Sequence, residues 1–380
     1  MASPRFRRTR IVCISDTHNC TVNLPEGDVL IHAGDLTNQG SYSELSRAVK
    51  WLESTKFEAK IVIAGNHDVT LDKDFYAEHG SYFHNQDPQS SADCLSLLAS
   101  SSSITYLCHS SATVRLSSPD GPHTIFTIFG SPYSPRHGLW AFYYDAPTTI
   151  SNHSELTNLW GSIPLDTDIV VTHTPARTHC DETDERRATG CEALRRALWR
   201  VRPRLAVCGH IHDGRGAQRV QWDLGSQNVK YAEASVVRWD DPGVGSKKIS
   251  LVDLTGRKAP CLANDGSPGG GSNAESSAVA DAHADLATGR RVHEPKSVQY
   301  SFGSDIVDAQ IAGSSIIGLG GDPASGRCDS HALAGRLGRQ ETCIVNAAIM
   351  KSRYPHIGGK KFNKPIVVDL NLPVWTDNGA

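Results

Sequence analysis

The sequence predicts a layered α/β fold, with strands in the middle and helices outside. Two observations predict it. Five short runs are apolar on both faces, as is typical of strands buried on both sides of a sheet. Segments with helical spacing lie between some of these runs. The five runs are RIVCISD (10–16), VLIHAGD (29–35), KIVIAGNHD (60–68), DIVVTHT (168–174) and LAVCGHIH (205–212).

Two segments have the apolar spacing of amphipathic helices. In the first, 41–57, Ser41 and Glu44 have the spacing of a capping box. The second is 192–201. The apolar positions on one face are Leu45, Ala48, Val49 and Leu52 in the first helix, and Leu194, Ala197, Leu198 and Val201 in the second.

Composition divides the chain into a core, an insertion and a C-terminal part. The core is predicted over 1–256. From 257 to 338 the chain is rich in Gly, Ser, Ala and Asp, a composition that buries too little apolar surface to offset chain entropy. We expect a largely irregular insertion there. The Val- and Ile-rich runs TCIVNAAIM (342–350) and KPIVVDLNL (364–372) predict strands in 339–380 that complete the core domain.

Charge and cysteine usage exclude several classes of protein. The 380 residues carry 38 Lys and Arg against 41 Asp and Glu, a formal charge of −3, so a polyelectrolyte is excluded and non-specific nucleic-acid binding is disfavoured. There is no apolar run near the roughly 18–20 residues that span a bilayer. The basic start lacks the apolar stretch of a secretory signal. Ten cysteines without a CxxC pair are typical of reduced core thiols, so we expect a cytoplasmic protein with no membrane partner.

The five strand-like runs end in side chains that bind metals. Asp16 and His18 are two residues apart, so both point to the same side of an extended backbone, and His210 and His212 repeat this spacing. Strand ends in such folds meet at one rim. Mixed carboxylate, imidazole and amide donors suit Mn²⁺, Fe²⁺ or Zn²⁺. Seven donors exceed what one ion accepts, so two ions and a bridging carboxylate are implied. The seven are Asp16, His18, Asp35, Asn66, His173, His210 and His212.

Each of these fragments alone is weak, because Asp-x-His or Gly-Asn-His-Asp also occurs in ordinary turns. Their joint occurrence, in order, resembles the calcineurin-like metallophosphoesterases. The signature is D-x-H, G-D, G-N-H-D, a strand-end His and G-H-x-H, and it covers roughly 10–256 plus the C-terminal strands. The segments 130–142, 172–181 and 190–214 resemble one branch, the small metallophosphoesterase-domain proteins of animals and fungi. The resemblance implies an α/β/β/α sandwich with two central mixed sheets and a binuclear metal site at the strand ends.

Two departures from the family pattern stand out. Asn38 occupies a position where many relatives carry a second Asp, which weakens the expectation of a carboxylate there. The insertion at 257–338 falls outside the common core, and no function is carried onto it.

The resemblance also implies roles for the site residues. Asp16, His18, Asp35 and His212 would hold one metal, and Asp35, Asn66, His173 and His210 the other, with Asp35 bridging. The ions would be Mn, Fe, Zn or Mg, and we expect Mn²⁺ to support activity in vitro. A bridging hydroxide between ions about 3.5–4 Å apart would attack phosphorus. His67 is then placed as general acid or phosphate donor, and Asp68 is expected to orient it.

Four further residues are candidate substrate contacts. Arg136, His137 and Trp140 lie in a loop that the family places near the pocket, where an arginine suits a phosphate oxygen and a tryptophan suits a base. A solvated arginine and a packed tryptophan are the alternative. His179, with Asp181, is a candidate for contacts around the metal ligands.

We therefore predict a binuclear metal-dependent phosphoesterase that acts on a small phosphorylated substrate, with nucleotide-type substrates among the candidates. Diester and monoester hydrolysis use the same metal core, so both stay open. Two alternatives also stay open: an enzyme of this fold acting on a non-phosphate metabolite, and a non-catalytic scaffold. The sequence does not define the oligomeric state.

Overall fold

The alternating side chains of β1 (Phe6–Ile14) explain how the layers form. Ile11 and Cys13 point into a core between two sheets, whereas Val12 and Ile14 point to the opposite face, against helices. All four are fully buried. A strand with both faces covered requires a further layer on each side. The computed structural model describes residues 5–145, 150–185, 187–224, 232–266, 336–352 and 355–376.

Within these residues the first sheet has the strand order β13-β15-β1-β2-β3-β4. β1, β2, β3 and β4 are parallel neighbours, and β15 pairs with β1 in the antiparallel sense. The strand bounds are Val29–Ala33 for β2, Ala59–Ile63 for β3, Ile104–Tyr106 for β4, Ser250–Asp253 for β13 and Ile366–Pro373 for β15.

The second sheet has the order β12-β11-β14-β10-β9-β6-β5. β14, β10, β9 and β6 run parallel, and β5, β11 and β12 are antiparallel to their neighbours. The bounds are Ser110–Arg115 for β5, Ile125–Ser131 for β6, Ile169–Thr172 for β9, Leu205–Cys208 for β10, Gly216–Trp222 for β11, Glu233–Arg238 for β12 and Glu341–Asn346 for β14. Ser134–Pro135 (β7) and Tyr143–Tyr144 (β8) form a separate short pair.

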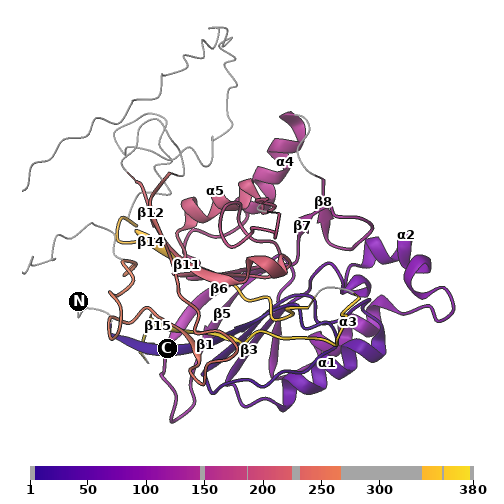
Figure 1. The fold of residues 1–380 in the computed structure, drawn as a ribbon, viewed down its shortest axis with the longest axis horizontal. Coiled ribbons are helices and arrows are strands. Elements are labelled where there is room, and N and C mark those ends of the chain that lie inside the picture. The colour runs from indigo at the N-terminus through magenta and orange to yellow at the C-terminus, as the bar shows by residue number, and fades with distance from the viewer. Residues whose placement is uncertain are drawn as a thin grey trace, which may run out of the picture.

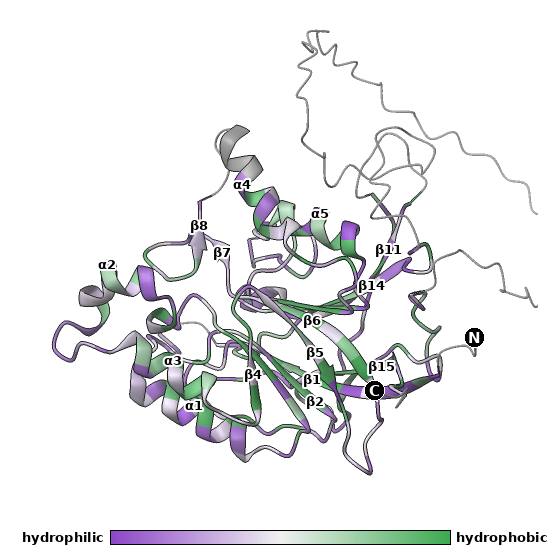
Figure 2. Ribbon diagram, turned by 180° about the vertical axis from the view of Figure 1, so that it is seen from behind, coloured by the Kyte–Doolittle hydropathy of each residue, from purple (hydrophilic) through white to green (hydrophobic). Residues whose placement is uncertain are grey.

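Helices cover the outer face of each sheet (Figure 1). α1 (Tyr42–Ser54) and α3 (Ser91–Ala99) pack on the first sheet, with α2 (Lys73–His84) beside them. α4 (Ile150–Gly161) and α5 (Glu192–Val201) pack on the second. Short 3-10 turns follow at Val69–Leu71 (η1) and His212–Gly214 (η2). The layers confirm the predicted α/β/β/α sandwich with two mixed sheets. Figure 2 shows the apolar residues concentrated along the strands between the helical layers.

Both helices expected from the sequence are present. α1 begins at the predicted capping box, because the Ser41 side chain accepts from the Glu44 backbone N–H and the Glu44 carboxylate accepts from that of Ser41. α5 coincides with 192–201 and ends at Arg202, which has a left-handed backbone. No helix among the described residues is long and apolar enough to cross a membrane.

The C-terminal strands complete both sheets. β14 lies between β11 and β10 in the second sheet, and β15 lies between β13 and β1 in the first. Most of the predicted insertion, 267–335, lies outside the described residues. Its two described flanks meet, because Asn264 and Arg339 form an antiparallel bridge and the Gln340 N–H donates to the Ala263 carbonyl at 2.9 Å.

We expect that 267–335 can be replaced by about four to six Gly and Ser residues, a length that closes a hairpin. The melting temperature should stay within about 5 °C of the full chain, since the described core keeps its contacts. Differential scanning calorimetry checks this. A chain truncated after Gln340 is the control, because it lacks a central strand of each sheet and should show no cooperative transition. Loss of the transition in the loop replacement would contradict the expectation.

Candidate metal centre

The predicted ligands lie directly after five strands that end at one rim. Asp16 and His18 follow β1, Asp35 follows β2, and Asn66 follows β3; His173 follows β9, and His210 and His212 follow β10. Both sheets therefore contribute ligands. Five of the seven are buried, and the His210 and His212 residues are partly exposed. The structure brings together all the predicted metal ligands.

Three of the ligands form a first donor group. One side-chain donor atom from each of Asp16, His18 and His212 lies within 4.8 Å of the others. His212 Nε2 lies 3.4 Å from Asp16 Oδ1, and His18 Nε2 lies 3.7 Å from Asp35 Oδ2.

A second donor group lies on the other side of Asp35. Asp35 Oδ1 lies 3.5 Å from His173 Nε2, and the same nitrogen is 3.0 Å from Asn66 Oδ1. The His210 ring lies beside that of His173, with centroids 5.0 Å apart. One oxygen of Asp35 therefore faces each donor group, as a bridging carboxylate requires.

These spacings fit metal ligation. Two donors that each lie about 2.1 Å from one ion, at tetrahedral or octahedral angles, are roughly 3.0–3.4 Å apart. The carboxylate–imidazole separations of 3.4–3.7 Å are longer than charge-assisted hydrogen bonds and close to that spacing. Oxygen and imidazole donors suit divalent ions from Mg²⁺ to Zn²⁺.

Hydrogen bonds fix which atoms of the ligands face the site. His173 Nδ1 donates to the Ala33 carbonyl at 2.9 Å, so Nε2 is the nitrogen turned toward Asp35. The His210 backbone N–H donates to both oxygens of Asp16 at 3.1 Å. Such outer contacts orient metal ligands and set their tautomers.

Burial and charge shift the pKa values of the imidazoles in opposite directions. Burial lowers the pKa of His18 to about 4 and that of His210 to about 3, so both are neutral and keep a lone pair at pH 7. Burial also opposes protonation of His173, but the neighbouring Asp35 carboxylate outweighs it and raises the pKa of His173 to about 9. Asp35 in turn has a pKa well below its usual range, because adjacent imidazoles outweigh its burial. The buried negative charge of Asp35 therefore favours binding of cations at this site.

The ligand backbones are strained. Asp16, His18, Asp35 and His210 have φ between 45° and 68°, the left-handed region that non-glycine residues seldom adopt. Each such residue costs on the order of 1 kcal/mol or more, and such strain clusters at functional sites. The strain falls on four of the seven predicted ligands, Asp16, His18, Asp35 and His210, which lie at the same rim.

Two glycines make room for this convergence. A Cβ added to Gly34 would lie 2.6 Å from His173 Nδ1, and φ at Gly34 is +97°. A Cβ on Gly65 would collide with Asp35 Oδ1. The glycine before each ligand is needed because another ligand packs against its α carbon.

The expected role of Asp68 is wrong. Its carboxylate accepts hydrogen bonds from the backbone N–H groups of Leu36, Thr37 and Gly65 at 2.9–3.2 Å, and from the Thr37 hydroxyl at 2.7 Å. Asp68 therefore joins the turns that follow β2 and β3. Its burial, together with the Asp35 charge, raises the pKa of Asp68 to about 6.

His67 is instead oriented by Asn38. His67 Nδ1 donates to the Asn38 backbone carbonyl at 2.9 Å, and the His67 backbone N–H donates to Asp35 Oδ1 at 2.8 Å. The His67 ring also meets the His18 ring edge-on, with centroids 4.9 Å apart. A ring nitrogen of His67 lies within 4.8 Å of donors of His18 and Asp35, so the residue borders the first donor group.

The predicted substrate contacts have different surroundings. Arg136 Nε pairs with Asp145 at 2.6 Å and its guanidinium lies over the Tyr143 ring. His137 is exposed. Trp140 stacks on the His67 ring, with centroids 3.8 Å apart. Of the three, only Trp140 reaches a predicted catalytic side chain.

His179 does not suit substrate binding. It is buried, and its two ring nitrogens contact Gln218 Oε1 and Glu233 Oε1, both at 3.0 Å. Asp181 accepts from the Thr178 and Gly190 backbone N–H groups. Both residues hold the loop after His173 in place, which corrects the expectation for His179.

Sequence reasoning missed Asn346. This buried residue at the end of β14 donates from Nδ2 to the carbonyls of Cys180 and Ile211 at 2.9 and 2.8 Å. Ile211 lies between two predicted ligands, so Asn346 supports the His210–His212 turn. The signal was present, because the run TCIVN also ends a strand in a polar residue at the same rim.

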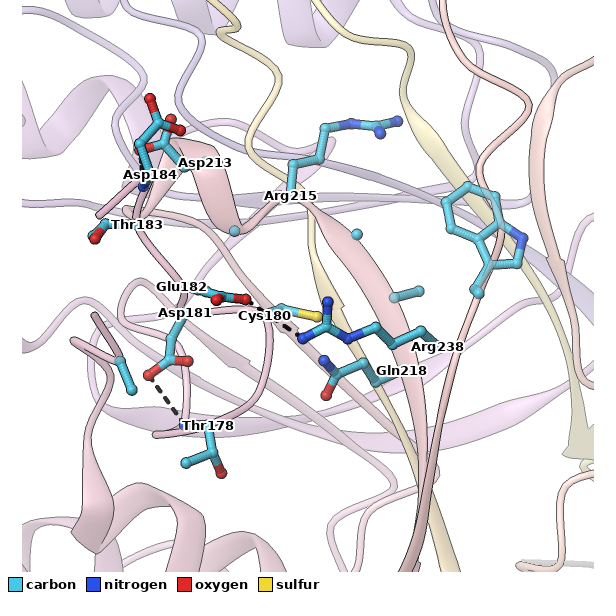
Figure 3. Close-up of a pocket in the computed structure, with 15 residues that line it drawn as sticks. Thr178, Cys180, Asp181, Glu182, Thr183, Asp184, Asp213, Arg215, Gln218 and Arg238 are labelled. Atoms are coloured by element: carbon cyan, nitrogen blue, oxygen red, sulfur yellow. Dashed lines mark hydrogen bonds and ion pairs between the residues drawn. The ribbon is translucent and has the colours of Figure 1, made fainter. Parts of the chain in front are cut away.

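Two neighbouring cavities open beside the metal centre. One, of about 560 Å³, is lined by His212, Lys351 and Asn363 together with Asp184, Asp213 and Arg215. The last three also line a second cavity of about 580 Å³ (Figure 3). In Figure 3 the Glu182 carboxylate points toward the Arg238 guanidinium, which lies 3.5 Å away. Space for a substrate therefore extends from His212 along η2 and the start of β11.

Comparisons with known proteins agree with this geometry. Residues 9–214 match the model of the family described as calcineurin-like phosphoesterase. The chain is 40% identical over 232 residues to "Probable rhamnogalacturonate lyase C" of Emericella nidulans, covering 60% of this chain and 20% of that protein. It is 37% identical over 239 residues to "Metallophosphoesterase domain-containing protein 1" of Homo sapiens, covering 60% of this chain and 66% of the human protein. The chain thus spans a fifth of the first relative and just under two thirds of the second.

Among solved structures, purple acid phosphatase PPD1 from yellow lupin aligns with 60% of this chain and 41% of its own, with a TM-score of 0.32 and 14% identity.

The geometry predicts that Asp35→Asn lowers the metal content from two ions per chain to one or fewer, because an amide offers one oxygen where the carboxylate offers two. Inductively coupled plasma mass spectrometry after desalting measures this. Asp369→Asn is the control, since Asp369 pairs with Arg10 on β1 at 2.8 Å and should leave the metal content at two. Two tightly held ions in Asp35→Asn would rule out the bridging role.

A second prediction concerns Asn346→Ala. The change removes the amide donor to the Cys180 carbonyl and one of the two donors to the Ile211 carbonyl, which also accepts from the Gly214 N–H. The free energy of unfolding should therefore fall by about 1–3 kcal/mol and metal affinity by about 10- to 100-fold. Urea titration and metal competition measure these effects. Asn371→Ala, which removes only long contacts of 3.4 Å and 3.8 Å, should change stability by less than about 0.5 kcal/mol. Equal effects of the two substitutions would contradict a role of Asn346 in supporting the metal site.

Proposed function

The chain belongs to the calcineurin-like phosphoesterase family, and on this premise we propose that it is a binuclear metal-dependent hydrolase of phosphate esters. The observation that carries the proposal is the position of Asp35. This buried carboxylate directs one oxygen to each of two donor groups. Such an arrangement suits two metal ions that share one carboxylate, and paired ions are typical of phosphate-ester hydrolysis.

The ligands divide between the ions as the family resemblance implies. Asp16, His18 and His212 would hold one ion with Asp35. Asn66, His173 and His210 would hold the other with the same carboxylate. When bound, two divalent ions supply Lewis acidity toward the phosphoryl oxygens and acidify a water molecule between them. Mn²⁺ is the ion we propose for activity in vitro, because the carboxylate and amide oxygens of Asp16, Asp35 and Asn66 suit it.

The chain's own residues provide proton transfer and orientation. The Asn38 carbonyl only accepts hydrogen bonds, so His67 Nδ1 keeps its proton and Nε2 is the nitrogen that gains or loses one. We assign to Nε2 the donation of a proton to the leaving oxygen of the ester, which is worth about 10²–10⁴-fold in rate. Asp68 holds the turns that present Asp35 and His67.

The substrate in this proposal is a small phosphate diester or monoester. It would approach through the cavity beside His212, where Lys351 offers a positive charge to a phosphoryl oxygen. The name of the fungal relative describes a protein of which this chain covers 20%, so lyase chemistry is not carried over. The described cysteines form no disulfide, which supports the proposed cytoplasmic location.

The proposal is tested by turnover of bis(p-nitrophenyl) phosphate and p-nitrophenyl phosphate after reconstitution with Mn²⁺, Zn²⁺, Mg²⁺ or Fe²⁺. Turnover that EDTA abolishes and Mn²⁺ restores supports it, and the ratio of the two rates assigns diester or monoester preference. Two bound ions without turnover of either ester would favour a scaffold or a non-phosphate substrate.

His67→Ala should lower kcat toward a phenyl ester, whose leaving group needs a proton, by about 10²–10⁴-fold while two ions stay bound, because the side chain moves a proton and is not needed to hold metal. Metal analysis and steady-state kinetics on the same preparations measure both properties. His79→Ala on α2 is the control, since His79 contacts Phe75 outside the site, and it should retain full turnover. Loss of an ion in His67→Ala would make His67 a ligand.

A further inference from the structure

A short loop is fastened to the turn that carries His67. The Ala141 N–H donates to the Asn66 carbonyl at 3.1 Å, and the Phe142 N–H donates to Asp72 Oδ2 at 2.8 Å. Ala141 and Phe142 are buried at 0% and 4% exposure. Because these two residues are anchored, the preceding residue, Trp140, has little freedom to move away from the site.

Trp140 is held between two rings. Its indole lies against His67, with centroids 3.8 Å apart and planes inclined by 33°. Phe83, from the last turn of α2, packs on Trp140 with centroids 5.4 Å apart. His67 therefore covers part of the indole on which a substrate base would otherwise stack. This disfavours the base-stacking role considered for Trp140 from the sequence.

The other contacts of His67 do not by themselves fix the rotation of its imidazole, so Trp140 can restrain that rotation. The hydrogen bond from Nδ1 to the Asn38 carbonyl fixes a single point on the imidazole. The ring rotates about its Cβ–Cγ bond, and one hydrogen bond at Nδ1 limits this rotation without fixing it. The indole stacked on its face, with the His18 ring at its edge, defines the plane of the imidazole. Proton transfer depends on that plane, because the donor N–H must point at the leaving oxygen.

We propose that Trp140 is a positioning residue that fixes the plane of the His67 imidazole for proton transfer to the leaving group. The inference rests on the proposed function, since it assigns a role within phosphate-ester hydrolysis. Trp140 acts through His67 and needs no contact with the substrate.

The test is a series of aryl methyl phosphate diesters whose leaving phenols range from 4-nitrophenol to phenol. A nitrophenolate leaves without a proton, whereas a phenolate depends on the acid. Trp140→Leu should lower kcat about 10- to 100-fold for the phenyl ester and about 2-fold or less for the 4-nitrophenyl ester, with KM and metal content unchanged. Trp140→Phe keeps a ring and should retain most of the activity.

Two controls separate this effect from a general loss of structure. Trp51→Leu alters another tryptophan packed on the same hydrophobic core as Trp140. It should not lower kcat for the phenyl ester more than kcat for the 4-nitrophenyl ester. In a His67→Ala background, Trp140→Leu should have no further effect, because the two residues act as one unit.

An equal loss across the ester series, or a raised KM with kcat kept, would overturn the positioning role. If Trp140→Leu does not fold, the ester series measured on Trp140→Met, which also removes the ring, and the double-substitution cycle built with it decide the question. Absence of turnover by the native chain toward every ester would overturn the proposed function as well, so the two failures are distinguishable.

Discussion

The structure depends on one buried carboxylate placed between two groups of nitrogen and oxygen donors. Asp35 faces His18 with one oxygen and His173 with the other. A buried carboxylate surrounded by imidazoles is costly unless positive charge compensates it. The strained backbones of four ligands, and the glycines that let ligands pack together, make sense as the means of placing donors around a compensating pair of cations.

The two sheets hold this arrangement from opposite sides. β1, β2 and β3 deliver one set of ligands and β9 and β10 the other, so the centre forms only when the sheets are packed face to face. The C-terminal part of the chain locks that packing. β14 and β15 each enter one sheet, and the Ile349 N–H donates to the Ser15 carbonyl, next to Asp16, at 3.0 Å. Stability and ligand geometry are therefore coupled.

Much of this could be predicted from the sequence, because strands buried on both faces and polar residues at their ends are local patterns. The same patterns predicted the seven donor residues that meet at the rim and both amphipathic helices. Three features could not be predicted from local sequence patterns. They are the hydrogen bonds by which Asp68 joins two turns, the support that Asn346 gives to the His210–His212 turn, and the stacking of Trp140 on His67. Each depends on contacts between segments about 30 to 170 residues apart, which a single sequence does not encode in its local periodicity.

The most direct test is anomalous diffraction at the manganese edge from crystals of the Mn²⁺-loaded chain. The structure predicts two peaks about 3.5–4 Å apart, on either side of Asp35, with His212 and His18 beside one and His173 and His210 beside the other. A single peak, or peaks away from Asp35, would contradict a binuclear centre and remove the basis for the proposed hydrolysis.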